Sequence, residues 1–408
     1  VDAVVPADSR VEAEVAAHGR VRPVGSLAAV VSALNGTAPW PEPDDPPHRV
    51  AEAPLPDLAD VRGQPVARRS LEIAAAGGHH LLLVGPPGSG KTMLAQRLPG
   101  LLPPLDRDTA LQATMIHSAA GVALPPGGLV QRAPFRAPHH SSSLVAIVGG
   151  GSSTLRPGEV SVAHGGVLFM DELGEFPVGV LETLRQPLEE EVVHVARADT
   201  RAALPARVLL VAATNPCPCG GGGPGECECD EGRRQRYLRR LSGPLLDRFD
   251  LRVAVHRPAV DELIDGDAGE PSVVVAERVQ RAREVSAARQ GCPNAALDPP
   301  ALDRWAPLTP TARAALRAEM ERGRLTGRGY HRIRRVARTL ADLGPVPGEA
   351  VDEAHVVEAL SLRARLGTGA AGPPPIAGST TSGPAVGGPS IGPAIGPAIG
   401  PGTGGRVA

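Results

Sequence analysis

The stretch "HLLLVGPPGSGKTMLAQRL", residues 80–98, decides the fold of this chain. Four apolar residues, Leu81 to Val84, predict a buried strand, and helical spacing begins at Lys91. Between them lies a Walker A pattern formed by Gly85, Pro86, Pro87, Gly88, Ser89, Gly90, Lys91 and Thr92. In this strand–loop–helix context, backbone N–H groups and the helix dipole hold phosphates. The stretch therefore predicts a P-loop nucleotide site in an α/β fold, with Thr92 as a ligand of Mg²⁺.

Lys91 is the only lysine among the 42 basic residues of the chain, and every other one is arginine. A compact ammonium with three rotatable donors can reach β- and γ-phosphate oxygens from inside a tight loop, where a planar guanidinium does not fit. This use of a single lysine favours ATP binding. It also excludes a serine–lysine protease dyad, because no second lysine exists to serve one.

Polar side chains follow two further apolar runs. In "GGVLFMDELGEF", residues 165–176, the predicted strand Val167–Met170 ends at Asp171 and Glu172. Ligands bind at the C-terminal ends of such strands, so we expect Asp171 to hold Mg²⁺ and Glu172 to activate the attacking water. The alternative is a pair of surface acids capping a turn. In "RVLLVAATNP", residues 207–216, Asn215 ends a third strand, which we place between the other two; it either positions the water or simply marks a turn.

Four of the five cysteines lie between residues 217 and 229, in "CPCGGGGPGECEC". They are too few and too local for a secreted disulfide framework. Four thiolates suit tetrahedral Zn²⁺, although the C-x-C spacing is tighter than the usual C-x₂-C. Three interpretations stay open: free thiols, redox-labile pairs, or a structural zinc site formed by Cys217, Cys219, Cys227 and Cys229.

Composition separates the 408 residues into regions. Residues 61–255 alternate short apolar runs with helical patterns, which indicates a parallel sheet, while residues 256–366 have mainly helical spacing. Residues 46–60 are rich in proline and acid and predict a linker, and the Gly/Pro/Ala-rich residues 367–408 predict a disordered tail. A net charge of -2 and 2% aromatic residues give no global attraction to nucleic acid. With no apolar run of about 20 residues, we expect a cytoplasmic protein without a membrane partner.

Several segments together resemble the ComM/YifB family of magnesium-chelatase-like AAA+ ATPases, over about residues 15–365. They are "GQPVARRSLEIAAAGGHHLLLVGPPGSGKTMLAQRLPGLLPPL", "PFRAPHHSSSLVAIVGGGS", "RPGEVSVAHGGVLFMDELGEF", "LRQPLEE", "ATNPCPCG" and "LSGPLLDRFDL". The resemblance implies an α/β P-loop NTPase of the AAA+ type, with a three-layer αβα core and a C-terminal helical lid domain. It also implies an insert in helix 2, a hairpin before sensor 1, and hexameric rings with ATP sites between subunits. Residues 1–45 then correspond to the remnant of an N-terminal Lon-like (S5-like) domain that is otherwise missing.

The resemblance also assigns residues by position. Asn215 corresponds to sensor 1, Arg248 in "LLDRFD" to the arginine finger, and Arg328 in "GRGYHRI" to the sensor 2 arginine. Arg332 and Arg335 are alternatives to Arg328. An arginine supplied across a subunit interface neutralises charge on the transferred phosphoryl group. Without the resemblance, Arg248 reads as a surface arginine in a turn.

The substrate is the least determined part. Arginines cluster in residues 233–252 and 322–338, and "QRAPFRAPHHSSSLVAIVGGGSS" begins with a basic group formed by Arg132, Arg136, His139 and His140. In the family this last segment faces the ring's pore, where it can contact DNA backbone. We therefore expect a Mg²⁺-dependent ATP-hydrolysing ring motor, a DNA translocase or branch-migration helicase of competence-linked recombination. The alternatives are a chelatase-like or protein-remodelling motor subunit, and a nucleotide-dependent switch or scaffold that does little work.

Overall fold

The computed structural model describes residues 2–16, 20–42, 53–150, 156–196, 201–221, 227, 229–241, 243–345 and 348–364. The predicted disordered tail, residues 367–408, lies outside the described residues. So does the 46–52 part of the predicted linker.

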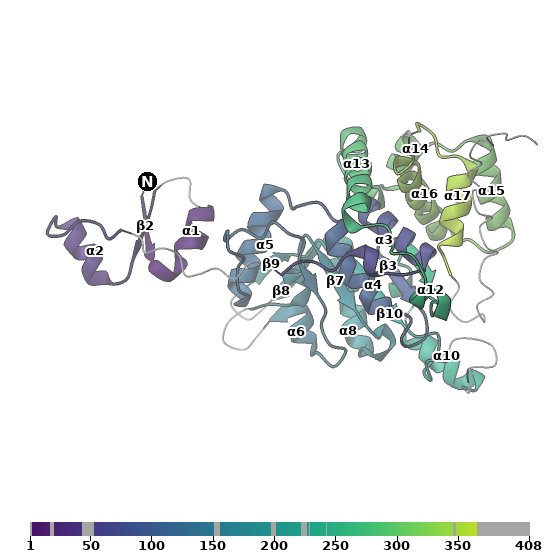
Figure 1. Cartoon of the computed structure of the whole chain (residues 1–408), viewed down its shortest axis with the longest axis horizontal. Coiled ribbons are helices and arrows are strands. Elements are labelled where there is room, and N and C mark those ends of the chain that lie inside the picture. Colours follow the sequence, from purple (N-terminus) through teal and green to yellow (C-terminus); the bar gives the residue numbers. More distant parts are fainter. Residues whose placement is uncertain are drawn as a thin grey trace, which may run out of the picture. The chain divides into compact units, whose positions relative to one another are not determined.

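A five-stranded parallel sheet forms the centre of the fold (Figure 1). Its order is β11–β3–β10–β7–β4, and every neighbouring pair runs parallel. The strands are β3 (Leu81–Val84), β4 (Phe135–Arg136), β7 (Val167–Met170), β10 (Leu209–Thr214) and β11 (Leu251–Ala254). The predicted strands Leu81–Val84 and Val167–Met170 are confirmed with their bounds. The third strand, β10, lies between them as expected.

Helices cover both faces of this sheet, because alternate strand residues point to opposite faces. On β3, Leu81 and Leu83 belong to one hydrophobic cluster and Leu82 to the other. The helices and short 3₁₀ turns between the strands are η2 (Leu58–Asp60), α3 (Pro65–Gly77), α4 (Lys91–Arg97), η3 (Leu98–Leu101), α5 (Arg107–Ala120), α6 (Leu144–Val148), α7 (Glu159–Val162), η4 (Leu173–Glu175), α8 (Val178–Thr183), α9 (Arg185–Glu190), α10 (Glu231–Arg240) and α11 (Gly243–Leu246). The three-layer αβα architecture is confirmed.

Two hairpins interrupt the core. A short pair, β5 (Gly149–Gly150) and β6 (Arg156–Pro157), follows α6, and a longer antiparallel pair, β8 (Val192–Ala196) and β9 (Arg201–Pro205), precedes β10. In chain order, the first pair corresponds to the helix-2 insert and the second to the hairpin before sensor 1 that the resemblance implies.

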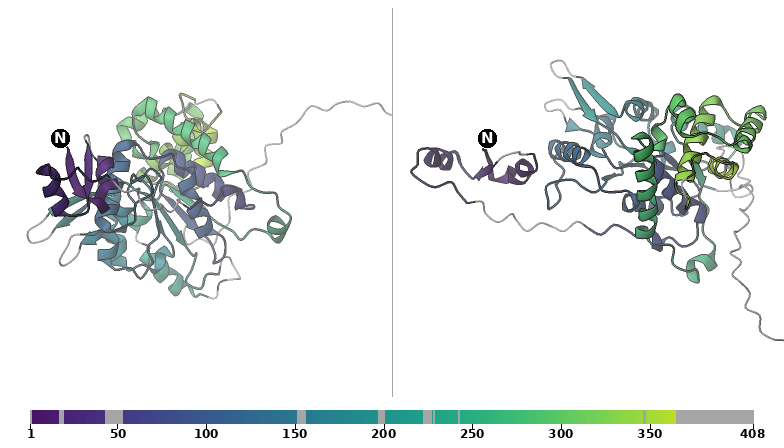
Figure 2. Two further views of the ribbon diagram at one scale, coloured as in Figure 1. Left: turned by 60° about the vertical axis from the view of Figure 1, so that its left-hand side comes forward. Right: turned by 90° about the horizontal axis from the view of Figure 1, so that it is seen from above.

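The C-terminal part is helical and gathers beside α3 (Figure 2). Its elements are α12 (Val260–Ile264), α13 (Ser272–Gln290), η5 (Asn294–Ala296), α14 (Pro299–Trp305), α15 (Pro310–Glu321), α16 (Gly327–Asp342) and α17 (Glu353–Ser361). Residues from these helices, such as Val279 and Val336, share one hydrophobic cluster with Leu83 of the sheet. The helical region is therefore packed on the sheet through apolar contacts, and the boundary at residue 255 stays a prediction.

The N-terminal region contains β1 (Ala3–Pro6), η1 (Ala7–Ser9), α1 (Arg10–Ala16), β2 (Val21–Val24) and α2 (Leu27–Leu34). β1 and β2 pair in parallel as a separate two-stranded sheet. Within the described ranges, no helix combines the length and apolar character needed to cross a bilayer.

Candidate nucleotide site

The phosphate loop connects β3 to α4, and the predicted helix start at Lys91 is confirmed. Gly88 and Gly90 have φ values of 74° and 86°, which glycine adopts without a steric penalty. At Gly85 the backbone approaches β11 so closely that a Cβ would lie 2.1 Å from the carbonyl oxygen of Val255. The glycines of the motif are therefore required by the shape of the loop.

Lys91 lies inside the loop with only 8% of its surface exposed. Its Nζ donates hydrogen bonds to the carbonyl oxygens of Gly85 at 2.7 Å and Pro86 at 2.9 Å, and to Oδ1 of Asn215 at 3.3 Å. Burial lowers the pKa of Lys91, and the nearby carboxylates of Asp171 and Glu172 oppose that shift. Nζ is already removed from water and held by neutral oxygens. Exchange of these contacts for the negatively charged oxygens of a phosphate is therefore favourable.

The predicted magnesium ligands meet in the structure. Oγ1 of Thr92, in the first turn of α4, donates to Oδ2 of Asp171 over 2.7 Å. Asp171 follows the buried strand β7, which fixes its position at the C-terminal edge of the sheet. A hydroxyl and a carboxylate are the hard oxygen donors that Mg²⁺ prefers.

A cavity of about 440 Å³ opens at this edge. Its lining brings together most of the predicted nucleotide, magnesium and catalytic residues: Pro87, Gly88, Ser89, Gly90, Lys91, Thr92, Asp171, Glu172 and Asn215. Met93 and Thr214, which the sequence did not predict, also line the cavity, whereas Gly85 and Pro86 do not. The side-chain Oγ of Ser89 is buried, and it has no hydrogen-bond partner among the described residues. A buried hydroxyl without a partner costs free energy, so it is suited to accept a ligand. Together these features fit the phosphates and Mg²⁺ of a bound nucleotide.

Glu172, the predicted base, has a left-handed backbone with φ of 51°. Its Oε2 lies 3.2 Å from Nδ1 of His140, in the segment that the sequence marked only for DNA contact. His140 also packs edge-on against Phe176. Because this contact joins residues far apart in sequence, no local pattern could predict it.

Sequence reasoning also missed two residues that touch the phosphate loop. The guanidinium of Arg257, just beyond β11, donates to the carbonyl oxygen of Pro87 from Nη2 at 3.2 Å and Nε at 3.3 Å. Gln64, with a left-handed φ of 53°, donates from Nε2 to the carbonyl oxygen of Ser89 at 2.8 Å. The available signal for Arg257 was its position after a strand, at the edge where ligands bind.

The predicted arginine finger lies on the opposite edge of the sheet. Arg248 precedes the N-terminal end of β11, whose first residue bonds to the carbonyl oxygen of His80, just before β3. Since the strands are parallel, the phosphate loop is at their other end. Arg248 pairs with Glu189 of α9. It therefore does not reach the phosphate loop of its own chain.

The three sensor 2 candidates differ in their surroundings. Arg332 donates from Nη1 to Oδ1 of Asp250 at 2.6 Å, and Arg335 from Nε to the carbonyl oxygen of Leu297 at 2.7 Å. Arg328 has 74% of its side chain exposed. Its Nη1 lies 3.7 Å from Oδ2 of Asp247, the residue that precedes Arg248 in the chain. Arg328 is thus the candidate most accessible to another molecule.

The four predicted zinc ligands come together directly after β10. The sulfur atoms of Cys217, Cys219, Cys227 and Cys229 all lie within 4.8 Å of one another. Burial raises the pKa of the Cys217 thiol to about 12, while hydrogen bonding with Cys217 lowers the pKa of Cys219 to about 6. The arrangement provides four sulfur donors for one metal ion.

Tyr237 of α10 was not singled out by the sequence. Its hydroxyl lies 2.9 Å from Oγ1 of Thr214, the last residue of β10, and its ring covers Gly174 of η4. A Cβ at Gly174 would lie 2.7 Å from that ring. Tyr237 thereby holds α10 against the strand end that carries Asn215.

The basic segment before α6 is largely paired. Arg136 donates to both carboxylate oxygens of Glu159, at 2.6 and 2.8 Å, and Nη1 of Arg132 donates to the carbonyl oxygen of Ala53 at 3.1 Å. Nδ1 of His139 lies 2.7 Å from Oγ of Ser141. The fourth predicted DNA-contacting residue, His140, is paired with Glu172, so the four residues do not form one unpaired basic cluster.

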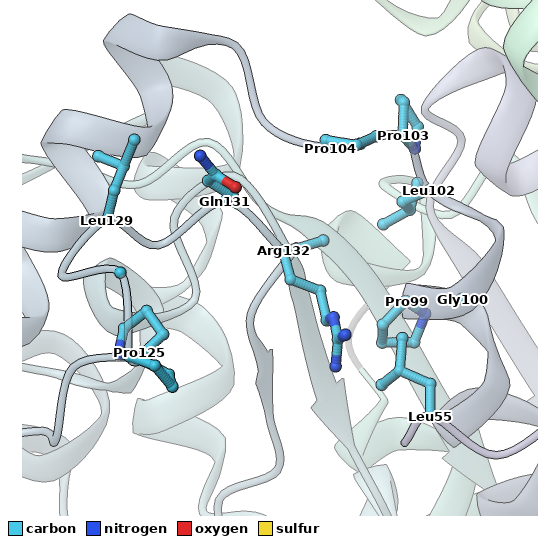
Figure 3. A pocket seen from close by; sticks show the side chains of 13 residues that line it. Leu55, Pro99, Gly100, Leu102, Pro103, Pro104, Pro125, Leu129, Gln131 and Arg132 are labelled. Carbon is cyan, nitrogen blue, oxygen red and sulfur yellow. The ribbon is translucent and has the colours of Figure 1, made fainter. Parts of the chain in front are cut away.

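A second cavity of about 530 Å³ lies between η3 and the segment before β4. Figure 3 shows Arg132 pointing toward Leu55 and Pro99, with Pro125 and Leu129 on the other side. Its lining contains several prolines and no carboxylate. This cavity therefore lacks the donors that a magnesium nucleotide needs.

Comparison with protein families covers most of the chain. The model for "Magnesium chelatase, subunit ChlI" matches residues 57–263, and the model for its C-terminal region matches residues 269–363. Together they cover the sheet, the candidate nucleotide site and the C-terminal helices.

Individual relatives agree with these matches. An uncharacterized protein of Mycobacterium tuberculosis is 47% identical over 368 residues, covering 88% of this chain and 72% of the relative. The uncharacterized protein YifB of Escherichia coli is 43% identical over 339 residues, covering 83% and 66%. Competence protein ComM of Haemophilus influenzae is 45% identical over 312 residues, covering 76% and 60%. A more distant match, 27% identical over 175 residues, is a probable DNA helicase of Arabidopsis thaliana and covers 43% and 22%.

Proposed function

This chain belongs to the magnesium-chelatase-type AAA+ family that includes ComM and YifB, and from that premise we propose that it is a Mg²⁺-dependent ATPase acting as an oligomeric motor on DNA. The observation that carries the ATPase proposal is the meeting of Lys91, Thr92 and Asp171 in one cavity. Mg²⁺, when bound, neutralises the charge of the phosphates.

The residues of the site divide the work of hydrolysis among them. Gly85–Thr92 hold the phosphates, and Thr92 and Asp171 hold the magnesium ion. Glu172 takes the proton of the attacking water, and Asn215, which contacts Lys91, orients that water. Arg248 serves the site of a neighbouring subunit, because it cannot reach its own phosphate loop, and Arg328 acts as the sensor 2 arginine.

The same geometry supports the proposal that the chain assembles. If Arg248 completes the site of another copy, that site lies between subunits, and a head-to-tail contact of this kind can close into a ring. We propose that ATP favours such rings and that six subunits form each ring. The matched region spans 60–72% of the three bacterial relatives.

The DNA substrate is supported by the relatives rather than by one surface of this chain. ComM is described as a competence protein, and the distant plant relative as a probable DNA helicase. We propose branch migration or translocation of DNA through the pore of the ring. The magnesium chelatase match favours a second candidate, a motor that remodels a protein or chelatase partner.

The structural ion of the cysteine cluster is proposed to be zinc. Zn²⁺ with four thiolates is tetrahedral, and closed four-sulfur sites are structural rather than catalytic. In a chain with this cluster the ion stabilises the loop after β10 and does not itself contact the reacting groups of ATP.

The ATPase rate, measured with Mg²⁺ in the absence of DNA and with linear or branched DNA, tests the proposal. We expect branched DNA to raise turnover, with a stimulation that weakens as salt increases. The control is Glu172→Gln, which should bind ATP yet lose most hydrolysis. Hydrolysis that is unchanged by any DNA would favour the remodelling motor, and absence of hydrolysis would favour a nucleotide-dependent switch.

A further inference from the structure

The cysteine cluster lies between β10, which leads into the nucleotide site, and α10. Cys217 comes two residues after Asn215 at the end of β10, and Cys229 comes two residues before α10. Cys217 is 1% exposed, while Cys219 is exposed at the surface. The cluster thus extends from a buried cysteine to an exposed one, and a metal ion can reach it from solvent.

The spacing of the sulfur atoms fits one ion. Sγ of Cys219 lies 3.2 Å from Sγ of Cys217 and 3.5 Å from Sγ of Cys227, and Cys217 and Cys227 are 3.4 Å apart. A tetrahedral ion with Zn–S bonds of about 2.3 Å places its sulfurs about 3.8 Å apart. A disulfide needs about 2.05 Å, and a cluster of several iron atoms spreads its four thiolates more widely.

Backbone geometry at the first cysteine pair is already that of a metal-binding turn. The N–H of Gly220 bonds to the carbonyl oxygen of Cys217 at 3.1 Å, and the N–H of Gly221 points at Sγ of Cys219 at 3.4 Å. An amide that donates to sulfur stabilises the thiolate form. Metal binding releases the thiol protons to solvent, including the one that Cys217 donates to the carbonyl oxygen of Gly221.

Gly220 makes direct contact with the phosphate loop. A Cβ built at Gly220 would lie 2.7 Å from Cγ of Pro87, and its φ of +76° is one that glycine adopts readily. Pro87 also accepts the hydrogen bonds from Arg257. The cysteine turn therefore forms one wall behind the tip of the phosphate loop.

Asn215 connects the cluster to the reacting end of the site. Its Oδ1 lies 3.3 Å from Nζ of Lys91, and only Pro216 separates it from Cys217 in the chain. A shift of the cysteine turn is transmitted to Asn215 through this short and stiff connection. The turn thus touches the phosphate loop through Gly220 and the lysine through Asn215.

From these contacts we infer that a single thiolate-bound ion in the cysteine cluster positions both Asn215 and the tip of the phosphate loop, so that metal loading controls nucleotide binding and hydrolysis. The inference rests on the proposed nucleotide site. Asn215 and Gly220 act here as positioning residues. Without the ion, the four sulfurs have only weak thiol contacts to hold the turn in place.

Metal binding is tested first. The purified full chain is depleted of metal and titrated with Co²⁺, whose thiolate complexes absorb strongly when four sulfurs surround the ion. We expect one Co²⁺ per chain, displaced by Zn²⁺, in the wild type and in the control variant Cys292→Ser, whose cysteine lies outside the cluster. Cys219→Ser should weaken the binding and alter the spectrum. A wild-type chain that gives no thiolate absorption overturns the inference.

The effect of the bound metal on the phosphate loop is measured in the absence of nucleotide. Hydrogen exchange of peptides that cover residues 81–96 is compared for zinc-loaded chain, metal-depleted chain and Cys219→Ser. We expect the metal-depleted chain and Cys219→Ser to exchange faster in the loop than the zinc-loaded chain, and Cys292→Ser loaded with zinc to match the wild type. Equal exchange in loaded and depleted chain overturns the coupling.

Nucleotide measurements complete the test. Because a misplacement of about 1 Å costs roughly 10²-fold in rate, we expect turnover to fall by about that factor in Cys219→Ser. Gly220→Ala should retain the Co²⁺ spectrum yet weaken ADP binding, since its methyl group displaces Pro87. Unchanged ADP binding in both variants overturns the inference.

The outcomes separate this inference from the proposed function. If both the zinc-loaded and the depleted chain hydrolyse ATP, at equal rates, the ATPase proposal stays intact and the coupling is removed. A zinc-loaded chain that protects the loop but never hydrolyses ATP removes the ATPase proposal and keeps the effect of the metal on the loop.

Discussion

Lys91 shows how the environment of one side chain restricts its identity. Its Nζ lies between two loop carbonyls at 2.7 and 2.9 Å, and the side chain is almost fully enclosed. A guanidinium is planar and longer, so it cannot occupy the same position and still contact phosphate oxygens. The single lysine of the chain is therefore explained by shape as well as by charge.

Lys91→Arg is expected to lose ATP hydrolysis despite its conserved charge, with turnover falling by about 10²–10³-fold, the usual effect of removing one donor to a developing charge. Steady-state ATPase assays with Mg²⁺ measure this, and Lys91→Ala provides the comparison. If the arginine variant turns over ATP at the wild-type rate, the steric explanation is wrong.

His164 links a single proton to stability. Its Nδ1 accepts the backbone N–H of Arg207 at 3.1 Å, and Nε2 faces Oε1 of Gln112 at 3.0 Å. Burial, helped by the charge of Arg207, lowers the pKa of His164 to about 4, while an unfolded histidine has its ordinary value of about 6.5. Since Nδ1 must stay unprotonated to accept this bond, the folded state favours the neutral ring.

The direction of the pH dependence follows from the linkage between proton binding and folding. The folded-state pKa is the lower one, so the stability from His164 is complete above about pH 6.5 and is lost as pH falls toward about 4. We expect the thermal midpoint of the wild type to decline over this window. His164→Asn keeps an acceptor near the Arg207 N–H and should show a smaller decline; an equal decline would remove His164 as a contributor.

Among the elements, α10 is attached to β10 by one aromatic residue, Tyr237. The hydroxyl of Tyr237 meets Oγ1 of Thr214, and its ring fills the space above Gly174. Burial raises the pKa of Tyr237, so the phenol stays protonated and can donate. The helix after the cysteine cluster is thus fastened to the end of β10.

Tyr237→Phe leaves the Thr214 hydroxyl without this partner, which should destabilise the fold by about 1–2 kcal/mol. Denaturant unfolding measures the change. The double variant Tyr237→Phe with Thr214→Val removes both polar groups and should recover part of the loss. A double variant that is less stable than the sum of the two single changes would contradict the hydrogen bond.

The elements of the core could be predicted from sequence because their signals are local. The apolar run Leu81–Val84 and the glycines that follow it specify a strand and a loop without reference to the rest of the chain. The contacts of Tyr237, Arg257 and His140 could not be predicted in this way, because each joins residues brought together only by packing. The cysteine cluster is intermediate: its composition left a zinc site open beside free thiols and redox-labile pairs, and the contact between Gly220 and Pro87 required the structure.

For the whole molecule, the parallel sheet separates the two halves of the catalytic machinery. The phosphate loop, Asp171 and Asn215 follow the C-terminal ends of their strands, whereas Arg248 precedes the N-terminal end of β11. Folding of one chain cannot bring these edges together. If Arg248 takes part in hydrolysis, it must act on another copy, and activity must depend on assembly.

Mixing of two inactive variants tests this dependence. Lys91→Ala removes the phosphate contact and leaves Arg248, while Arg248→Ala does the reverse, so each variant alone should lack ATPase activity. In a mixed ring, an Arg248→Ala subunit keeps an intact phosphate loop and receives the arginine of a neighbouring Lys91→Ala subunit. An equal mixture with random neighbours should restore about a quarter of the sites.

Arg248→Ala should still bind ADP as tightly as the wild type, which separates loss of the finger from misfolding. A mixture that stays inactive while both variants assemble, or an Arg248→Ala chain that hydrolyses ATP normally, would show that Arg248 does not complete a neighbour's site.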